Sequence, residues 1–223
     1  MASKVLIVGA SRGIGLEFVR QYREAGAQVT ATARGDEGLA RIQALGARAL
    51  RVDVASAAGA SALAWPIDGE AFDVAILNAG VYGPRSSGLQ TPTQDEFDAV
   101  MHTNVLGALR VLPIVAEALA PGARLAVISS RMGSMALRTN PSGWLYRASK
   151  AALNSVLKDT SLALAGRALC VALHPGWVRT DMGGGEADLD VAESVATMRA
   201  TLAALTPAGH GGFFNHDGQP LPW

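Results

Sequence analysis

The stretch from Lys4 to Gly15 places the strongest constraint on how this chain can fold. An apolar run of strand length leads to Gly9, and a helical pattern begins at about Gly13. The turn between them reads Gly-x-x-x-Gly-x-Gly, and its glycines can adopt positive φ and expose backbone N–H groups. Because the following helix directs its positive end at the same spot, the stretch predicts a pyrophosphate site. A tight strand-to-helix turn without a ligand is the alternative.

Size and composition favour one soluble α/β domain. At 223 residues the chain can bury a substantial core, and 49% hydrophobic with 17% charged residues is typical of a folded protein. The 19 basic and 19 acidic residues give a net charge of zero, and no basic block appears. This balance argues against nucleic acid or an anionic membrane as a partner.

The cysteine and histidine content argues against disulfides and metal sites. The one cysteine, Cys170, lies in the apolar run 168–173, where we expect a small buried hydrophobe and no internal disulfide. No acid or cysteine pattern surrounds His210 and His216, so no metal site is predicted. The chain enters its first strand without a charged and apolar leader, and no apolar run approaches the roughly 18 residues of a membrane span. We therefore expect a cytoplasmic protein.

Strands and helices alternate along the chain with short connections, which predicts parallel pairing. The expected fold is α/β: a single-domain, Rossmann-type, doubly wound parallel sheet of about seven strands with helices on both faces. One domain would span 1–223, with a nucleotide-binding half over about 1–90 and a catalytic half over about 91–223. We expect Pro66 to stop an alanine-rich helix, and Pro113 to kink a long helix that Thr93 caps. The predicted strands are 4–8, 28–33, 48–52, 72–77, 124–130, 168–173 and 211–214.

Candidate catalytic residues fall at the carboxyl ends of strands, where a doubly wound sheet binds its ligands. Tyr146 and Lys150 are four positions apart, so they share one face of a helix predicted over 143–164. An ammonium near a phenol favours the phenolate, which lowers the tyrosine pKa from about 10 and suits it to proton exchange with a carbonyl or alcohol oxygen. Ser130, after the fifth strand, can hydrogen-bond the same oxygen. Taken alone, such a Tyr–Lys pair is more often exposed on a helix surface.

Several motifs together resemble the short-chain dehydrogenase/reductase family over nearly the whole chain. They are the glycine turn, Asn78-Ala79-Gly80, Asn104, Ser129-Ser130, Tyr146-Arg147-Ala148-Ser149-Lys150 and Pro175-Gly176, in the family's order and approximate spacing. The Tyr-Arg-x-Ser-Lys motif, the short length and the final residues 217–223 look most like the C-factor and sniffer type of carbonyl reductase. The resemblance implies a Rossmann-type domain that transfers a hydride between a nicotinamide and a carbonyl or alcohol carbon.

The same resemblance implies roles for individual residues. Tyr146 would be the general acid/base and Ser130 would position the substrate oxygen. Lys150 would hold the nicotinamide ribose and tune Tyr146, and Asn104 would keep a water in a proton relay to Lys150. The other implied cofactor contacts are Asn78, Ala79 and Gly80 on the adenosine side, Pro175, Gly176 and Val178 near the nicotinamide, and Thr180 at its carboxamide.

Two features depart from the family pattern. Val8 stands where the family usually has a threonine, which removes a hydroxyl that helps tie the glycine turn to a neighbouring strand. The interval from Ser130 to Tyr146 is longer than usual, and the extra residues lie within 132–144, a loop that must border the substrate. Ser134 is a rival for the serine role, although the Ser-Ser pair ending at Ser130 matches the family better.

Two arginines favour NADP(H) as the cofactor. NAD enzymes commonly bind the ribose 2′-hydroxyl with an acid after the second strand, where this chain has Arg34 and no acid. Arg12 can reach the same place, and two guanidinium groups suit a 2′-phosphate, unless both are simply solvated. Asp53 would meet the adenine, with Val54 supplying a backbone contact, or would cap a helix. The glycine turn completes the expected cofactor site with Gly9, Ser11, Gly13, Ile14 and Gly15.

The sequence thus predicts an NADP-dependent carbonyl reductase that converts a ketone or aldehyde to an alcohol reversibly. The alternatives are an NADP-binding sensor with incidental turnover, and a dehydratase or epimerase on the same scaffold. The partner would be a small carbonyl or alcohol substrate, and the two long helices could form a homodimer. We expect His102 at a packing or surface position and His174 as a satisfied core histidine. The expected pocket lining is Tyr82, Arg131, Met132, Met135, Trp144, Trp177 and Met182.

Overall fold

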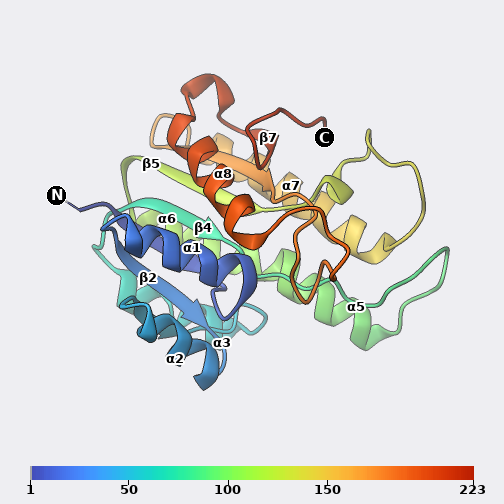
Figure 1. The fold of residues 1–223 in the computed structure, drawn as a ribbon, viewed down its shortest axis with the longest axis horizontal. Helices are drawn as coiled ribbons and strands as arrows, with labels where there is room; N and C mark the ends of the chain where they lie inside the picture. The colour runs from blue at the N-terminus through green and yellow to red at the C-terminus, as the bar shows by residue number, and fades with distance from the viewer. Residues whose placement is uncertain (1) are drawn as a thin grey trace.

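The computed structural model describes residues 2–223, and its centre is one seven-stranded sheet (Figure 1). The strand order is β3-β2-β1-β4-β5-β6-β7, and every neighbouring pair is parallel. The predicted fold class is confirmed. The strands are β1 (Lys4–Val8), β2 (Gln28–Ala33), β3 (Arg48–Arg51), β4 (Phe72–Leu77), β5 (Leu119–Ile128), β6 (Ala168–His174) and β7 (Gly212–Asn215).

Helices cover both faces of this sheet, so its central strands are buried on both sides. This is why β1 reads as an unbroken apolar run rather than an alternating one. One face carries α1 (Gly13–Glu24), α2 (Asp36–Ala44) and α8 (Val191–Ala204). The other carries α3 (Ala57–Ser61), α4 (Ala64–Ile67), α6 (Gly107–Glu117) and α7 (Trp144–Ala163), with α5 (Gln94–Met101) and the π-helical turn η1 (His102–Leu106) leading into α6.

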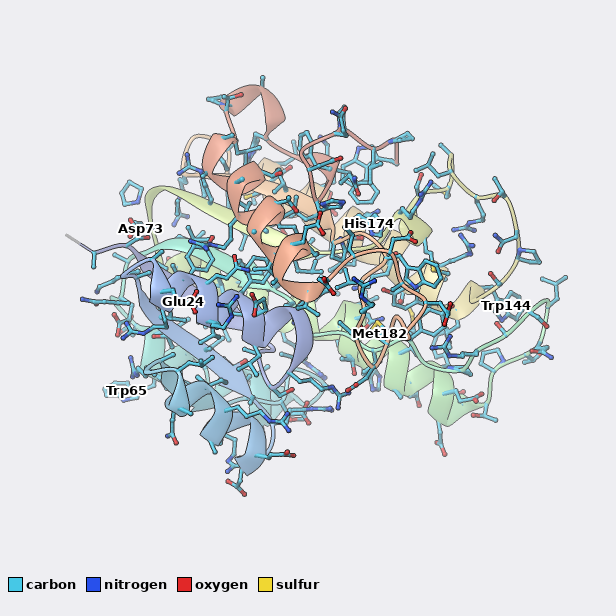
Figure 2. All side chains as sticks on the ribbon, in the orientation of Figure 1. Glu24, Trp65, Asp73, Trp144, His174 and Met182 are labelled. Carbon is cyan, nitrogen blue, oxygen red and sulfur yellow. The ribbon has the colours of Figure 1, made fainter. Side chains whose placement is uncertain are left out.

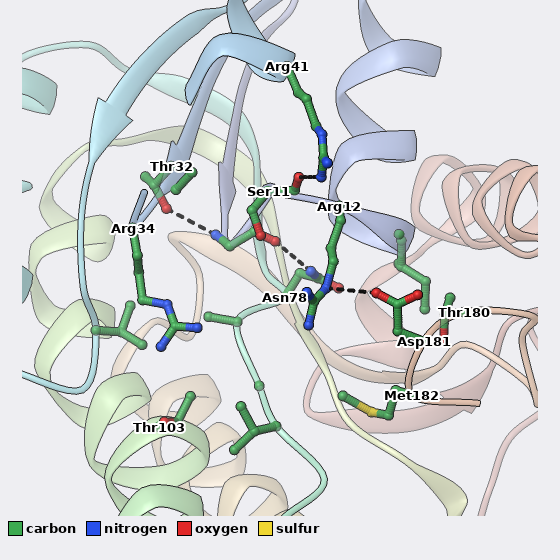
Figure 3. Close-up of a pocket in the computed structure, with 18 of the residues that line it drawn as sticks. Ser11, Arg12, Thr32, Arg34, Arg41, Asn78, Thr103, Thr180, Asp181 and Met182 are labelled. Carbon is green, nitrogen blue, oxygen red and sulfur yellow. Dashed lines mark hydrogen bonds and ion pairs between the residues drawn. The ribbon is translucent and has the colours of Figure 1, made fainter. Parts of the chain in front are cut away.

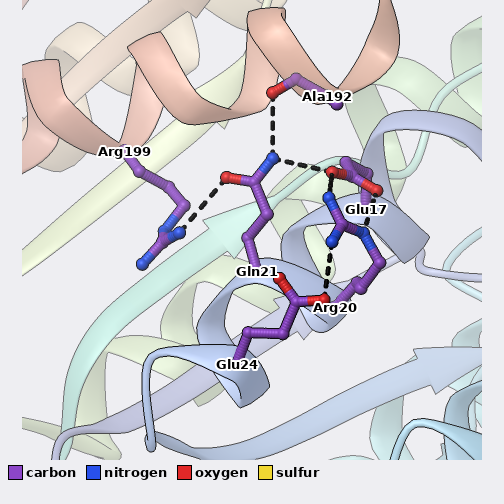
Figure 4. Close-up of polar contacts among 6 residues, drawn as sticks. All are labelled: Glu17, Arg20, Gln21, Glu24, Ala192 and Arg199. Carbon is purple, nitrogen blue, oxygen red and sulfur yellow. Dashed lines mark hydrogen bonds and ion pairs between the residues drawn. The ribbon is translucent and has the colours of Figure 1, made fainter.

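A polar network joins the first and the last of these helices (Figure 4). The Gln21 side-chain amide of α1 donates to the Ala192 carbonyl of α8 at 2.9 Å. Arg199 of α8 donates to the Gln21 side-chain oxygen at 3.2 Å. Within α1, Arg20 also forms ion pairs with Glu17 and Glu24. Because Gln21 is buried, both hydrogen bonds satisfy a polar group that would otherwise destabilise the α1–α8 contact.

The sheet has its switch point between β1 and β4. The chain leaves β1 into α1 on one face and leaves β4 toward α5 and α6 on the other. A crevice at the carboxyl ends of these two strands follows from that reversal, and ligands of doubly wound sheets bind there.

Pro66 does not stop the alanine-rich helix as expected. It lies in the first turn of α4, where the N–H that proline lacks needs no intrahelical partner. The segment is divided instead between the short helices α3 and α4.

The long helix after Thr93 departs from regular α-helix at η1 and not at Pro113. By length and composition the helical segment Gln94–Glu117 could cross a membrane, with a mean hydropathy of 1.5 in a window that is 33% buried. Asp98, Arg110 and Glu117 interrupt this segment, so it holds no unbroken apolar run of that length, and the core helix of a globular protein meets the same criterion. In this structure Val100, Val111 and Val115 of the segment are fully buried.

Cys170 is a free, fully buried residue of β6, as predicted. Within the described part of the chain, residues 2–223, no three His, Cys, Asp or Glu side chains gather in a way that could hold a metal ion.

Candidate active site

The turn after β1 is built from glycines whose Cβ positions are blocked. Gly9 has a φ of +89°, and a Cβ there would lie 2.6 Å from the backbone of Ala79. A Cβ on Gly15 would lie 2.1 Å from the Gly9 carbonyl oxygen and 2.6 Å from Nδ2 of Asn78. Arg12 is the N-cap residue of α1, and its side chain makes no capping hydrogen bond. The first N–H groups of α1 thus carry no side-chain cap, at the place where a phosphate is expected.

The hydroxyl that Val8 lacks is supplied by the neighbouring strand. The Gly9 N–H donates to Oγ1 of Thr32 on β2 at 3.0 Å. From the end of β4, the Asn78 amide donates to the Gly9 carbonyl at 2.6 Å. The turn is therefore tied to both strands that flank β1. Sequence reasoning missed Thr32, because a threonine within a strand also reads as an ordinary β-former.

A cleft of about 610 Å³ opens beside this turn (Figure 3). Its wall joins residues that the sequence places in separate motifs. Six predicted cofactor residues do not line this cleft. Gly15 packs against Gly9, and the other five lie nearer the catalytic centre: Tyr146, Lys150, Pro175, Gly176 and Val178. The predicted cofactor residues on the wall are Gly9, Ser11, Arg12, Gly13, Ile14, Arg34, Asp53, Val54, Asn78, Ala79, Gly80 and Thr180.

Arginines from four segments line the cleft, and three of them, Arg12, Arg34 and Arg41, are labelled in Figure 3; the fourth, Arg179, pairs with Asp190. Arg34 follows β2, and Arg12 in the turn pairs with Asp181 at 3.3 Å, both side chains being largely exposed. Arg41 of α2 also lines the cleft and donates to a backbone carbonyl of the turn at 3.2 Å. Sequence reasoning missed Arg41, because its four-residue spacing from Glu37 reads as a solvated helix pair.

Asp53 lies on the cleft wall and is not a helix cap. The N-cap of α3 is Ser56, whose Oγ accepts from the Gly59 N–H at 3.0 Å. Asp53 accepts instead from the Ala55 N–H at 3.1 Å. Of the two readings of Asp53, the N-cap is therefore wrong.

Tyr146, Lys150 and Ser130 come together at the carboxyl end of β5, and all three are buried. The Ser130 side chain lies close enough to Tyr146 to act on the pKa of its phenol. Nζ of Lys150 lies 5.7 Å from the centre of the Tyr146 ring and donates to the Ile128 carbonyl at 2.8 Å. The pair is therefore an internal one and not an exposed pair on a helix surface.

Burial controls the ionisation of these side chains. Desolvation raises the pKa of Tyr146 above its ordinary value, and the nearby Ser130 side chain acts in the opposite direction. Burial lowers the pKa of Lys150 to about 8. The expectation of a lowered Tyr146 pKa is therefore wrong for this structure, because desolvation outweighs the effect of the Ser130 side chain and Tyr82 acts in the same direction as desolvation. The favoured form is the protonated phenol, which can donate a proton to a carbonyl oxygen.

The two candidate serines differ in their partners. Oγ of Ser130 accepts from the Met132 N–H at 3.1 Å, and the same side chain acts on the pKa of Tyr146. Ser134 is fully buried, and its Oγ accepts from the Leu137 N–H at 3.1 Å. Of the two serines, only Ser130 acts on the pKa of Tyr146 within residues 2–223.

The η1 turn places Asn104 beside Lys150. Its amide donates to the Val81 carbonyl at 2.8 Å and to Oγ of Ser149 at 2.9 Å, and its oxygen accepts from the Val81 N–H at 2.8 Å. A Cβ on Gly80 would lie 3.3 Å from Oδ1 of Asn104 and 3.4 Å from Nζ of Lys150. Asn104 therefore joins the segment after β4 to α7 next to the lysine.

Tyr82 covers one side of Tyr146. Their rings stack with centres 4.6 Å apart. A Cβ on Gly143 would lie 2.5 Å from the Tyr82 hydroxyl and 3.1 Å from Cε of Met132. These contacts bring two predicted lining residues and the start of α7 against the catalytic tyrosine.

The other predicted lining residues gather at the same end of the molecule. Figure 2 shows Trp144 and Met182 at this end, opposite Asp73 and Trp65. Met182 lies on the cleft wall. Three of them are well exposed: Met135 (70%), Trp177 (50%) and Met182 (40%).

The segment after β6 returns toward the glycine turn. Gly176 has a φ of +85°, and a Cβ there would lie 2.4 Å from Leu189. Val178 is buried and forms a bridge with Leu189. A Cβ on Gly13 would lie 3.5 Å from Cγ2 of Thr180, so this threonine contacts the turn directly. The Pro175 carbonyl accepts from Ser194 of α8 at 2.5 Å, which fixes the segment at its start.

His174 is buried at the end of β6, and its Nδ1 has no hydrogen-bond partner within residues 2–223. The expectation of a satisfied core histidine is therefore wrong at this position. Burial lowers the pKa of His174 to about 3, with the charges of Arg131 and His216 acting in the same direction. In His210 both ring nitrogens have hydrogen-bond partners. Its Nδ1 accepts from the Cys170 N–H at 3.1 Å, and its Nε2 lies 2.9 Å from the Ser161 carbonyl oxygen.

Comparison with known proteins matches this arrangement to a family. The model of the short chain dehydrogenase family matches residues 3–188, which include β1 to β6 and every predicted catalytic residue. Among curated proteins, the C-signal protein of Myxococcus xanthus is 40% identical over 158 residues, which are 68% of this chain and 92% of that protein.

Solved structures agree with the family model. The carbonyl reductase Sniffer of D. melanogaster is 31% identical with a TM-score of 0.88, and the two chains cover each other completely. A carbonyl reductase from Pseudomonas aeruginosa PAO1, solved in complex with NADP, is 35% identical with a TM-score of 0.89 and the same full coverage. The chain belongs to the short-chain dehydrogenase/reductase family of oxidoreductases.

Proposed function

We propose that this chain is an NADPH-dependent carbonyl reductase that reduces a ketone or aldehyde to an alcohol, reversibly. One observation carries the proposal: Tyr146, Ser130 and Lys150 are buried together at the carboxyl end of β5, with Nζ of Lys150 5.7 Å from the centre of the Tyr146 ring, beside a nucleotide-sized cleft. The NADP bound to the Pseudomonas aeruginosa carbonyl reductase supports the same cofactor here.

The residues present fit a dinucleotide. The missing side chains at Gly9 and Gly15 let the turn pack directly against Ala79 and Asn78, and the uncapped start of α1 offers N–H donors to a pyrophosphate. Arg12 and Arg34 at the cleft suit a ribose 2′-phosphate, with Arg41 as a third cation. Asp53, Val54 and the segment 78–80 would hold the adenosine side, and 175–180 the nicotinamide side. When bound, the nicotinamide supplies the hydride.

Each catalytic side chain would then have one task. Tyr146 donates its phenolic proton to the carbonyl oxygen, and the Ser130 hydroxyl donates a hydrogen bond that holds this oxygen in place. Lys150 holds the nicotinamide ribose, and its pKa of about 8 lets it return a proton to Tyr146 near neutral pH. Asn104 positions the segment at Gly80 beside this lysine. The water relay at Asn104 and the homodimer stay predictions.

The first test is NADPH and NADH oxidation against ketones, aldehydes and quinones, with Tyr146→Phe alongside. Tyr22→Phe is the matched control, because Tyr22 stacks on Phe18 in α1. We expect turnover with NADPH that Tyr146→Phe abolishes while NADPH binding persists and Tyr22→Phe remains active.

Two other outcomes would select the alternatives. Tight NADPH binding without turnover of any carbonyl would favour the sensor. Conversion of a substrate by loss of water or by epimerisation, without net oxidation of NADPH, would favour the dehydratase or epimerase.

A further inference from the structure

The segments around Tyr146 carry arginines and no acids. Residues 74–94 and 118–158 contain no Asp or Glu. Three of their arginines, Arg85, Arg131 and Arg138, are exposed and form no ion pair within residues 2–223. We call these three the arginine rim.

Arg85 is linked to the catalytic tyrosine through one aromatic ring. Its Cζ lies 5.5 Å from the centre of the Tyr82 ring, and that ring stacks on Tyr146 at 4.6 Å. Arg85 also donates to the Met182 carbonyl at 3.2 Å. The guanidinium is therefore held over the aromatic wall of the site, while most of its donors are left for another acceptor.

Arg131 and Arg138 lie on the loop between Ser130 and Tyr146. Arg131 follows Ser130 directly in the chain, and its charge acts on His174 at the end of the next strand. Arg138 is close enough to Arg147, in the first turn of α7, for the two like charges to oppose each other. Arg147 is occupied, since it donates to the Ser142 carbonyl at 2.7 Å and to the Asn140 side chain at 3.0 Å. The one negative group on this loop is the terminal carboxylate of Trp223, which accepts from the Met135 N–H at 2.6 Å, and within residues 2–223 neither Arg131 nor Arg138 forms an ion pair with it.

The cations on the opposite side of the cleft are arranged differently. Arg12 pairs with Asp181, and Arg179 pairs with Asp190 at 2.7 Å. The chain as a whole is neutral. Arg34 on that side also forms no ion pair within residues 2–223, and we assign it to the cofactor phosphate. The arginine rim is a second positive region, at the mouth of the catalytic site, where it attracts an anion, and arginine forks match the two oxygens of a carboxylate.

We infer that the carbonyl substrate carries an oxyanion group, such as a carboxylate, which the arginine rim binds while the carbonyl oxygen lies at Tyr146 and Ser130. This inference rests on the proposed function and names the chemical class of its substrate. The anionic group takes no part in the reduction. It positions the carbonyl and increases the encounter rate.

The test uses a matched pair of aldehydes, 4-carboxybenzaldehyde and methyl 4-formylbenzoate, which differ in charge but share the reacting group. With NADPH we expect kcat/KM to be about tenfold higher for the acid, mainly through KM. The preference should shrink in 0.5 M NaCl, because salt screens exposed charges.

Variants connect the preference to the rim. Arg85→Gln, Arg131→Gln and Arg138→Gln should each lower the acid-to-ester ratio of kcat/KM by about threefold to tenfold. Arg167→Gln, at the opposite end of β6, is the control and should keep the wild-type ratio. The ratio is internal to each protein, so a general loss of folded enzyme does not change it.

The two possible failures are distinguishable. Equal turnover of acid and ester, or a ratio that the three variants leave unchanged, would overturn the inference and leave the reductase in place. Turnover of neither aldehyde would contradict the proposed function and the inference with it.

Discussion

The backbone N–H of Gly9 donates to the side-chain hydroxyl of Thr32 at 3.0 Å, and so β2 holds the turn that follows β1. The next N–H, that of Ala10, donates to the Thr32 carbonyl at 2.7 Å. One residue therefore satisfies two consecutive donors of the turn. The donors left for a phosphate are those at the start of α1.

Replacing Thr32 by valine should loosen this turn. The Gly9 N–H would lose its acceptor, so we expect the free energy of unfolding to fall by about 1–2 kcal/mol and NADPH binding to weaken. Thr32→Ser should restore both. Thr30→Val, two positions earlier on β2, is the control. Denaturant titration measures the stability of each variant, and fluorescence titration with NADPH measures its cofactor binding. Equal effects of the two valine substitutions would refute the role of the hydroxyl.

Gly15→Ala should be strongly destabilising. Its Cβ would lie 2.1 Å from the Gly9 carbonyl oxygen, and backbone must shift to accommodate it. We expect a loss of about 3 kcal/mol in the free energy of unfolding. Gly35→Ala, where a Cβ would meet nothing within 4 Å, should change stability by no more than about 0.5 kcal/mol. Urea unfolding of both variants checks this prediction. Similar unfolding midpoints for Gly15→Ala and Gly35→Ala would count against the close packing of Gly15 on the Gly9 carbonyl.

The arginines at the cleft should select NADPH over NADH. Arg34→Ala and Arg12→Ala would each remove a charge-assisted hydrogen bond, so we expect KM for NADPH to rise about 10-fold to 100-fold. KM for NADH should change little, because NADH lacks the 2′-phosphate. Arg41→Ala should show the same selectivity with a smaller rise. Steady-state kinetics gives KM for NADPH and for NADH in each variant. An equal rise of both KM values would exclude recognition of the 2′-phosphate by these arginines.

His174 should make the fold sensitive to acid. Its pKa is about 3 in the folded protein against an ordinary 6.5, so between these values the unfolded chain binds the extra proton. The stabilisation is complete above pH 6.5 and is lost as pH falls toward 3. From pH 6.5 to pH 5 we expect about 2 kcal/mol of lost stability from this residue.

The variant His174→Gln should lose less stability than the wild type over that pH interval. His102→Gln, at an exposed position, serves as the control. Urea unfolding at the two pH values provides the comparison. An identical acid loss in the wild type and in His174→Gln would contradict the assignment.

The alternation of apolar runs and helical patterns was sufficient to predict the sheet, because buried parallel strands leave a strong signal. The start of β5 was not predictable in this way. Pro121 and Gly122 read as a turn, yet the strand begins at Leu119, which pairs with Phe72 before a register shift. Pairing with β4 overrides the local preference there.

The site was predictable where residues sit at strand ends, because parallel strands bring their carboxyl ends to one edge. The roles of Thr32 and Arg41 were not, since each depends on which neighbour its side chain reaches. The direction of the Tyr146 pKa shift also escaped prediction. It depends on how deeply α7 is buried, a property of the whole fold rather than of the Tyr-x-x-x-Lys spacing.

The π-helical turn η1 has a consequence for how the long helix tolerates change in length. A π turn holds one residue more than the α-helical turn it replaces, so it acts as an insertion already accommodated. Deleting one residue at η1 would remove this insertion and leave a continuous α-helix in which α5 and α6 keep nearly their present rotation relative to each other. A deletion within regular α5 or α6 has no such reserve and would rotate the buried face on one side by about 100° relative to the other. The helical segment should therefore keep its buried faces after the loss of one residue at η1 and lose them after the same loss at any other point.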